Sequence, residues 1–312
     1  MNTPELDFSA ALSERTPRIV QAAKLLKSSE RRKTKRFLVE GGNSVEASLA
    51  TGAATDVFVT QAGSEKYADL LQLAVNVHAY IHPINHKAAQ KLADTSTTPG
   101  IFAVCRNVTW NLHQALKGHP RMVCVGVETN DPGNAGTLMR LGDAMGANAV
   151  IFAGDTVDPQ APKAARASTG SLFHVPVVRN RDIDFVLEKL QRQGFALAAT
   201  AADGDLDIRN SADTLEQPIA WLFGNEAHGL SQAVQDRADF RVRIPIRGNA
   251  ESLNLATAAA ICMYETAKVQ DAAYERERAA KEAGEELPAA APQPPETLAA
   301  SGALETSAVP EA

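Results

Sequence analysis

Much of what this sequence predicts depends on one segment, Glu128-Thr129-Asn130-Asp131-Pro132-Gly133-Asn134-Ala135-Gly136-Thr137-Leu138-Met139-Arg140. It follows an apolar run, Met122 to Val127, which is typical of a strand buried on both faces. It leads into a helix, because Leu138, Leu141 and Met145 recur at helical spacing. A polar, glycine-containing turn between a strand and a helix presents free backbone N–H groups at a sheet end, where open α/β sheets bind ligands. The segment therefore predicts an α/β fold with a binding site at this turn.

The same pattern continues along residues 121–270. Apolar runs at 149–152, 195–199 and 219–223 are expected to be strands, with helices at 135–145, 162–167, 183–193 and 231–238 and from Ser252 onward. This alternation predicts a mainly parallel sheet with helices on both faces.

Residues 18–106 predict a separate, small α/β domain after an N-terminal extension, residues 1–17. Helices are expected at 18–27, 44–50, 65–75 and 86–93, a basic turn near 28–35, and strands at 37–40, 56–60, 79–81 and 101–106. Weak periodicity ending at Gly118-His119-Pro120 predicts a linker over 107–120.

The charge is unevenly distributed. Residues 271–312 hold three of the 31 Lys/Arg and nine of the 37 Asp/Glu, so 28 of each sign remain in residues 1–270. This Ala-, Glu- and Pro-rich tail is expected to be disordered, although the last helix can extend past Tyr274. Residues 15–36 carry nine Lys/Arg against Glu30 alone, which indicates either a phosphate-binding surface or a solvated basic helix and loop.

Composition excludes several classes of protein. No apolar run approaches the roughly 18 residues of a membrane span, and no signal pattern begins the chain, so a cytoplasmic protein without membrane contact is expected. Three separated cysteines, Cys105, Cys124 and Cys262, indicate buried thiols rather than disulfides. His78, His82 and His86 do not predict a metal site, because Pro83 breaks any helix that would align them.

Two further segments join a strand to a polar turn and a helix. They read Trp221-Leu222-Phe223-Gly224-Asn225-Glu226-Ala227-His228-Gly229-Leu230-Ser231 and Ile244-Pro245-Ile246-Arg247-Gly248-Asn249-Ala250-Glu251-Ser252-Leu253-Asn254-Leu255-Ala256. Such turns can converge on one ligand. Structural alternatives exist: Ser252 as a helix N-cap, Glu226 as a turn cap, and Arg140 as a surface charge.

These three segments, in this order and spacing, resemble the signature motifs of the SpoU (TrmH) family of RNA ribose 2′-O-methyltransferases. The segment from Lys163 to Pro176 is similar to a further family block, and Phe37-Leu38-Val39-Glu40-Gly41 resembles the start of the family's ribosomal-protein-like RNA-binding domain. The resemblance implies a SPOUT fold with a C-terminal trefoil knot that binds S-adenosylmethionine and works as a homodimer. No Gly-x-Gly-x-x-Gly follows a strand, which argues against the common methyltransferase fold.

The resemblance also assigns roles to residues of this chain. The central catalytic residue is Arg140, whose side chain points about 160° away from the apolar stripe of its helix. The implied sets are catalytic (Arg140, Asn134, Glu226, Ser252, Asn254), cofactor-binding (Thr200, Leu222, Gly224, Ile244, Ile246, Leu253) and RNA-binding (Arg31, Arg32, Lys33, Lys35, Arg36, Lys163, Arg166, Ser168), with no metal.

The implied substrate is structured RNA, with large-subunit ribosomal RNA favoured over transfer RNA. Two alternatives belong to other classes: a non-catalytic RNA-binding protein with a SPOUT shell, and a Rossmann-like nucleotide enzyme acting on small molecules. Intact Arg140, Glu226, Ser252 and Asn254 argue against the first. The N-terminal domain argues against the second.

Overall fold

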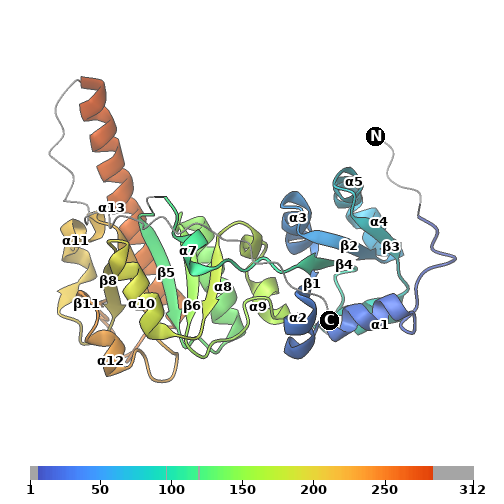
Figure 1. Ribbon diagram of the computed structural model, residues 1–312, viewed down its shortest axis with the longest axis horizontal. Coiled ribbons are helices and arrows are strands. Elements are labelled where there is room, and N and C mark those ends of the chain that lie inside the picture. The colour runs from blue at the N-terminus through green and yellow to red at the C-terminus, as the bar shows by residue number, and fades with distance from the viewer. Residues whose placement is uncertain (1–5, 96, 119, 284–312) are drawn as a thin grey trace, which may run out of the picture.

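A computed structural model shows two α/β units side by side, joined by one connecting segment (Figure 1). It describes residues 6–95, 97–118 and 120–283. The part of the tail beyond residue 283, expected to be disordered, lies outside the described residues.

The N-terminal unit is built on a four-stranded sheet in the order β1-β4-β2-β3. Its strands are β1 (Arg36–Glu40), β2 (Ala54–Val59), β3 (Tyr80–Pro83) and β4 (Ile101–Arg106), and only β2 and β3 are parallel to each other. Its helices are α1 (Pro17–Lys24), α2 (Ser28–Thr34), α3 (Gly42–Ala50), α4 (Gln61–Lys66), α5 (Ala68–Asn76) and α6 (His86–Leu92). Buried Ile19, Phe58 and Leu92 hold α1 and α6 on one face of the sheet, while Val45 and Leu71 hold α3 and α5 on the other.

The C-terminal unit contains a seven-stranded parallel sheet in the order β7-β6-β5-β10-β8-β11-β9. The strands are β5 (Met122–Val127), β6 (Ala149–Ala153), β7 (Val177–Asn180), β8 (Ala196–Thr200), β9 (Leu206–Asp207), β10 (Ile219–Phe223) and β11 (Phe240–Arg243). The helices are α7 (Leu112–Ala115), α8 (Pro132–Ala144), α9 (Pro162–Ala167), α10 (Ile183–Arg192), α11 (Ala212–Glu216), α12 (Gln232–Gln235) and α13 (Leu255–Ala283), with 3₁₀ turns at Ser171–Phe173 and Ile208–Asn210. The predicted parallel sheet between two helical layers is confirmed.

Side-chain alternation explains the two layers. Val123, Val125 and Leu197 face α7, α10 and α12, whereas Cys124 and Trp221 face α8, α11 and α13. Trp221 Nε1 donates to Thr266 Oγ1 at 2.9 Å, so the last helix is fixed to the central strand β10. This positions the start of α13 beside the ends of β5 and β10.

Several expected boundaries were wrong. The basic segment 28–35 forms helix α2, because Glu30 lies in its first turn and Arg31 to Lys33 lie in its last, as the helix dipole favours. The helix expected over 65–75 is two helices broken at Tyr67. The linker contains α7, whose Leu112 is buried. Helix α13 extends past Tyr274, as expected, and continues to Ala283, which lies inside the region 271–312 predicted to be a disordered tail.

The three cysteines are free and buried, as predicted. Burial raises the pKa of the Cys105 thiol to about 12 and raises that of the other two further. Among the described residues, no helix combines the length and apolarity that a bilayer crossing requires.

Candidate active site

The three polar segments singled out in the sequence meet at the carboxyl ends of β5 and β10. The side chain of Asn134, in the first turn of α8, donates to Glu226 Oε1 at 2.9 Å. Asn254, at the start of α13, donates through Nδ2 to Asn134 Oδ1 at 3.2 Å. We call this hydrogen-bonded set the Asn134 triad. It joins one residue from each of the three segments. The sequence pattern indicated only that these turns can converge.

Local sequence explains why Asn134 is held in place. Asp131 is the N-cap of α8 and accepts a hydrogen bond from the Asn134 backbone N–H at 2.8 Å, which lowers the pKa of the Asp131 carboxyl. Pro132 follows at the first helical position, where its fixed φ suits a helix start. Gly136 allows α9 to approach, because a Cβ there would lie 2.6 Å from Ala164 O.

Helix α13 begins later than predicted. Its cap is Asn254, whose Oδ1 accepts from the backbone N–H groups of Ala256 and Thr257 at 2.9 and 3.3 Å. Ser252 is therefore not the N-cap; it lies in the preceding loop and lines the cavity described below. One Asn254 side chain thus caps the helix with its oxygen and bonds Asn134 with its nitrogen.

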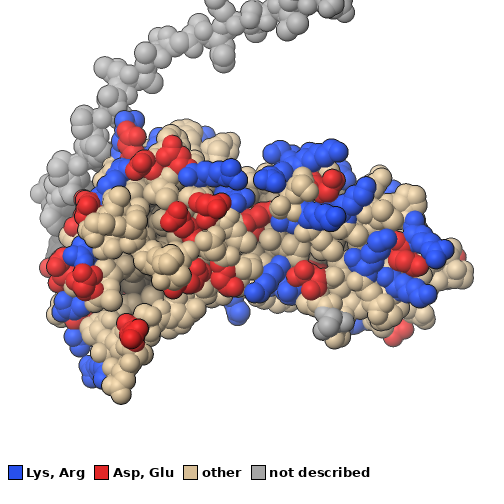
Figure 2. Space-filling view, turned by 90° about the horizontal axis from the view of Figure 1, so that it is seen from below, with Lys and Arg blue, Asp and Glu red and all other residues tan. Residues whose placement is uncertain are grey.

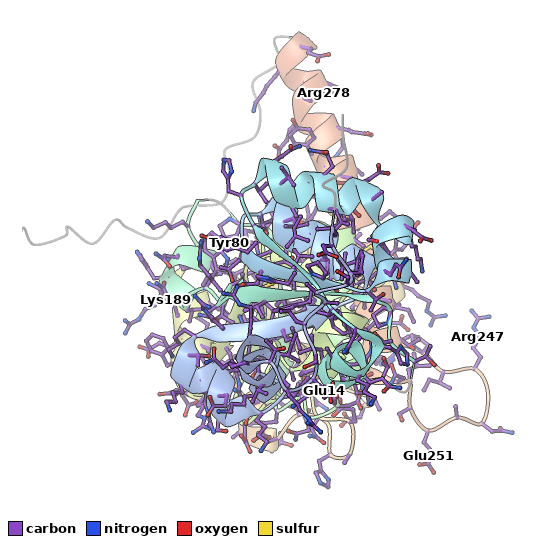
Figure 3. All side chains as sticks on the ribbon, turned by 90° about the vertical axis from the view of Figure 1, so that its right-hand side faces the viewer. Glu14, Tyr80, Lys189, Arg247, Glu251 and Arg278 are labelled. Atoms are coloured by element: carbon purple, nitrogen blue, oxygen red, sulfur yellow. The ribbon has the colours of Figure 1, made fainter. Side chains whose placement is uncertain are left out.

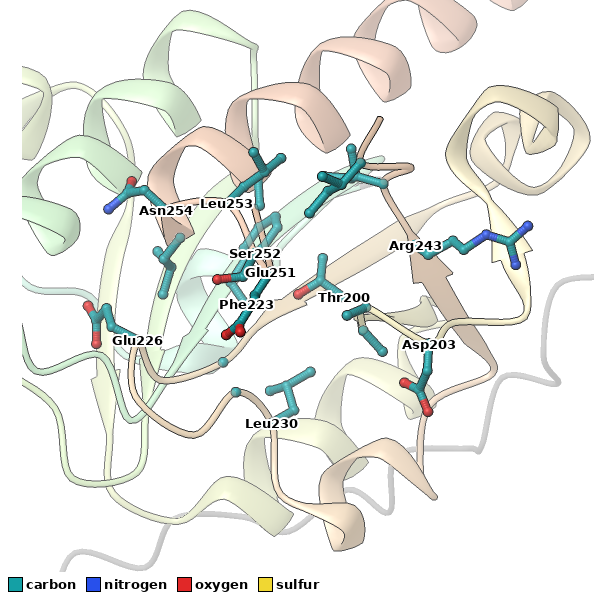
Figure 4. A pocket seen from close by; sticks show the side chains of 18 of the residues that line it. Thr200, Asp203, Phe223, Glu226, Leu230, Arg243, Glu251, Ser252, Leu253 and Asn254 are labelled. Atoms are coloured by element: carbon teal, nitrogen blue, oxygen red, sulfur yellow. The ribbon is translucent and has the colours of Figure 1, made fainter. Parts of the chain in front are cut away.

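A cavity of about 970 Å³, here called the loop cavity, lies beside the triad. It is lined by the loops after β8, β10 and β11, and Figure 4 shows around it Thr200, at the end of β8, together with Leu230 and Leu253 from the other two loops. The outer part of the third loop, with Arg247 and Glu251, projects from the body of the protein (Figure 3). Five of the six predicted cofactor residues line this cavity: Thr200, Gly224, Ile244, Ile246 and Leu253.

The sixth predicted cofactor residue, Leu222, is misassigned. Its side chain is fully buried against α10 and α12 and does not line the loop cavity. The backbone of Leu222 instead helps to position Thr200, because Leu222 O accepts a hydrogen bond from Thr200 Oγ1 at 3.1 Å. Asn225 was not among the predicted site residues, although its Nδ2 donates to Glu128 O at 2.8 Å and joins the first two segments. Its place next to Glu226 was the available signal.

Arg140 lies on the exposed side of α8 and does not line the loop cavity. It follows Asn134 by six residues, about 9 Å along the helix axis. No ion pair or side-chain hydrogen bond of Arg140 exists within residues 6–95, 97–118 and 120–283, so its guanidinium is available to a ligand. The predicted orientation away from the helix's apolar face is confirmed, because Leu138 is fully buried and Arg140 is exposed.

The predicted RNA-binding residues divide into two groups. Arg32, Lys33, Lys35 and Arg36 are exposed on the N-terminal unit, where Figure 2 shows Lys and Arg side chains gathered. Arg31 is only 6% exposed; it donates to Asp158 Oδ2 at 2.8 Å and to the carbonyls of Leu25 and Leu26. Its assignment as an RNA contact is wrong, because it fixes the N-terminal unit to the C-terminal one.

The same correction applies to part of the block around α9. Arg166 forms ion pairs with Glu40 and Asp94 of the N-terminal unit, and buried Ser168 donates to Ala165 O at 2.7 Å. Both residues therefore act within the protein rather than as RNA contacts. Lys163 remains more than half exposed and lies 3.6 Å from Asp131 at the start of α8.

Comparisons with known proteins match both units. Residues 121–264 match the SpoU rRNA Methylase family, and residues 16–103 match the MRM3-like substrate binding domain. A 23S rRNA guanosine 2′-O-methyltransferase of Bacillus subtilis is 32% identical over 256 residues, covering 81% of this chain and 96% of that protein. The chain belongs to the SpoU methylase family.

Solved structures of the family agree. The SpoU methyltransferase AviRb of Streptomyces viridochromogenes, in complex with the cofactor AdoMet, superposes with a TM-score of 0.73 at 28% identity, over 82% of this chain and all of that chain. An AdoMet-bound rRNA methyltransferase of Sinorhizobium meliloti superposes with a TM-score of 0.69 at 26% identity, over 81% of this chain and 95% of that chain. The predicted class, an S-adenosylmethionine-dependent RNA 2′-O-methyltransferase, is thereby confirmed for this SpoU methylase.

Substitutions of Arg31 and its neighbour Arg32 distinguish a basic residue that holds the two units of this SpoU methylase together from one that is expected to contact RNA. We expect Arg31→Ala to lower the free energy of unfolding by about 3 kcal/mol, because it leaves the partly buried Asp158 without its guanidinium. The salt dependence of RNA binding should not change. Arg32→Ala, at an exposed position, should preserve stability and reduce the salt slope. Chemical denaturation and a salt titration of RNA affinity measure both effects; the reverse pattern would contradict the assignment.

Proposed function

We propose that this protein methylates a ribose 2′-hydroxyl in large-subunit ribosomal RNA. The observation that carries the proposal is the Asn134 triad, which brings all three family segments together at the rim of the loop cavity. The substrate is favoured by the Bacillus subtilis relative, named as a 23S rRNA enzyme, which matches over 81% of the chain. The buried free thiols suit a reducing, cytoplasmic setting.

The residues of the loop cavity fit S-adenosylmethionine. Its volume lies in the range of small-molecule sites, and its lining combines apolar side chains with polar and charged ones. Ile244, Ile246 and Leu253 are placed to flank an adenine ring, and Thr200 and the backbone at Gly224 to bind polar edges. The bound cofactor supplies an electrophilic methyl group on a sulfonium.

Arg140 is proposed as the central catalytic residue. Methyl transfer forms a carbon–oxygen bond at the ribose, breaks a carbon–sulfur bond in the cofactor, and releases the hydroxyl proton. A guanidinium, with a pKa above about 12, is a poor base. Arg140 is better suited to hold an adjacent RNA phosphate in a bidentate manner and to stabilise the developing alkoxide, with a phosphate oxygen accepting the proton.

The remaining polar residues orient these groups. Asn134, Glu226 and Asn254 fix one another at the rim, and Ser252 lies in the same cavity. We propose that they position the ribose relative to the cofactor methyl. Such alignment is worth roughly 7–11 kcal/mol of the barrier.

We further propose that the two domains have separate functions: residues 18–106 bind RNA, and residues 121–270 bind the cofactor and carry out the methyl transfer. Arg32, Lys33, Lys35 and Arg36 supply the exposed positive charge for the first role. Lys163, beside the start of α8, extends it towards the active site.

The path of the chain supports a trefoil knot in the C-terminal unit. After β11 the chain returns to α13, which packs against α8 and β10 on the other side of β8. This return and the loop after β10 line the same cavity. An experimental structure with an unthreaded chain would contradict the knot.

A homodimer is supported by the surface beside the site. Arg140 is exposed on α8, and Tyr264 on α13, which packs against α8, is 56% exposed, so this pair of helices presents unburied surface. We propose that a second copy packs here. Sedimentation equilibrium that detects only monomers under assay conditions would contradict it.

Transfer of tritiated methyl groups to total RNA from cells lacking the gene tests the substrate. We expect the label in large-subunit ribosomal RNA. Label confined to transfer RNA would overturn the proposed substrate, and absence of label in either, with a folded protein, would favour the non-catalytic alternative.

A further inference from the structure

The N-terminal unit contains a second concavity, of about 790 Å³, far from the loop cavity in the sequence. We call it the basic groove. It lies between the α1–α2 region and one end of the four-stranded sheet, and its lining includes Arg18, Lys24, Arg36, Tyr80 and Arg106. None of these was assigned a role in the transfer reaction except Arg36, as a general RNA contact.

Strand register places three of these residues along one sheet end. Arg36 at the start of β1 pairs with Arg106 at the end of β4, and Tyr80 at the start of β3 pairs with Asp56 of β2. The strand order β1-β4-β2-β3 puts β1 and β3 three strand spacings apart, about 14 Å across the sheet. Asp56 also pairs with Val104, so Tyr80 lies two residues along the strands from the Arg36–Arg106 pair.

All three side chains also point to the same face. Side chains alternate along a strand, so Arg36 shares the face of Leu38, and Arg106 that of Val104, both in the core beneath α1 and α6. Tyr80 shares the face of His82, whose ring lies 5.1 Å from Phe58 in the same core. The sheet therefore presents two guanidinium groups and one phenol ring on the same face, near the same end.

The charge of the groove is available to a ligand. Arg18 is already bound, because its Nη1 lies 2.8 Å from both Asp56 Oδ1 and His82 Nε2. Within the part of the chain that the structure describes, Lys24, Arg36 and Arg106 have no carboxylate partner, and Glu30 is the other acidic residue of the lining. The groove is thus net positive and suited to phosphates.

Tyr80 distinguishes this surface from a merely basic one. Its side chain is 70% exposed, the highest value among the large hydrophobic residues that the structure describes, and Figure 3 shows it on the outer side of the N-terminal unit. An exposed aromatic ring next to phosphate-binding cations is the arrangement that stacks an unpaired base. A paired base has no free face to offer it.

We propose that the basic groove binds an unpaired RNA nucleotide, with its base stacked on Tyr80 and neighbouring phosphates on Arg36 and Arg106. The N-terminal domain would then recognise a loop, bulge or single strand near the target rather than a continuous helix. This inference rests on the proposed function, because it assigns the RNA of that reaction to a specific surface.

Fluorescence anisotropy with the full chain tests the role of Tyr80. The probes are a mixed-sequence single-stranded RNA pool and the same pool annealed to its complement. We expect Tyr80→Leu to weaken single-strand binding by about tenfold and to leave duplex binding unchanged, while Tyr80→Phe retains full affinity. The matched control is Phe185→Leu, an exposed aromatic on α10 of the other unit, which should change neither.

The double variant Arg36→Gln, Arg106→Gln tests the phosphate contacts. Its plot of log affinity against log salt should be shallower by about 1.4 for single strands, about 0.7 for each lost phosphate. Arg192→Gln, an exposed arginine on α10, should leave the slope unchanged. All positions are exposed, and thermal unfolding verifies that each variant folds.

If Tyr80→Leu lost single-strand and duplex affinity equally, or lost neither, the proposal that the basic groove binds an unpaired nucleotide would be overturned. An unaltered RNA affinity and salt slope in the double variant would overturn it as well. These results are distinguishable from failure of the proposed function, because the unsubstituted protein's methyl transfer to ribosomal RNA is measured separately and does not depend on the variants.

Discussion

Arg140→Ala is expected to reduce the rate of methyl transfer by at least about 10²-fold while S-adenosylmethionine affinity stays nearly unchanged. The side chain is exposed on α8 and does not line the loop cavity, so its removal leaves the cofactor contacts intact. In the proposed mechanism, the substitution removes a positive group that stabilises charge developing during the reaction. Single-turnover kinetics and isothermal calorimetry measure the two quantities separately.

Two further variants sharpen this result. Arg140→Lys keeps the charge but not the planar bidentate donor, so we expect an intermediate rate. Arg192→Ala removes another exposed helical arginine and should leave the rate unchanged. If Arg140→Ala lost cofactor binding at full stability, the residue would belong to the cofactor site and the proposed mechanism would fail.

Gly224→Ala is expected to weaken cofactor binding by about 10- to 100-fold. A Cβ on Gly224 would lie 2.2 Å from the carbonyl carbon of Gly229 and 2.3 Å from Leu230 N. Both neighbours are backbone atoms, so the loop after β10 must move, and with it the wall of the loop cavity. Calorimetry of S-adenosylmethionine binding measures the effect, and chemical denaturation measures the accompanying loss of stability.

The chain offers a matched control in Gly248. It lines the same cavity, but a Cβ there would meet no atom within 4 Å. Gly248→Ala should therefore bind the cofactor normally. Equal affinity in the two variants would show that the close approach at Gly224 does not shape the cofactor site.

The parts of the fold predicted correctly are those with strong periodicity. The fully buried runs of β5, β6, β8 and β10 and the apolar stripe of α8 each satisfy one pattern over several residues. Strand β7 was missed because Val177-Val178-Arg179-Asn180 gives no continuous apolar run. A strand was expected at the start of the third segment, but β11 lies just before it, where Arg241 and Arg243 interrupt the apolar pattern of Phe240 and Val242. Strand β9 has only two residues.

The site residues divide in a similar way. Asn134, Glu226 and Asn254 were assigned through the resemblance to the family motifs, and each sits at a strand–turn–helix junction, where local sequence fixes the direction of the chain. Arg31, Arg166 and Ser168 were misassigned because their roles depend on how two separate units pack, and residue type alone does not show whether a charge faces solvent or the other unit. The capping role of Asn254 likewise depends on where α13 begins.

Nucleoside analysis of the methylated RNA tests the central claim most directly. After transfer from labelled S-adenosylmethionine to large-subunit ribosomal RNA, complete digestion and mass spectrometry should place the new methyl group on a ribose 2′-oxygen. The Arg140→Ala protein should yield almost none of this product. A methyl group on a base, or equal product from the Arg140→Ala protein, would contradict the account.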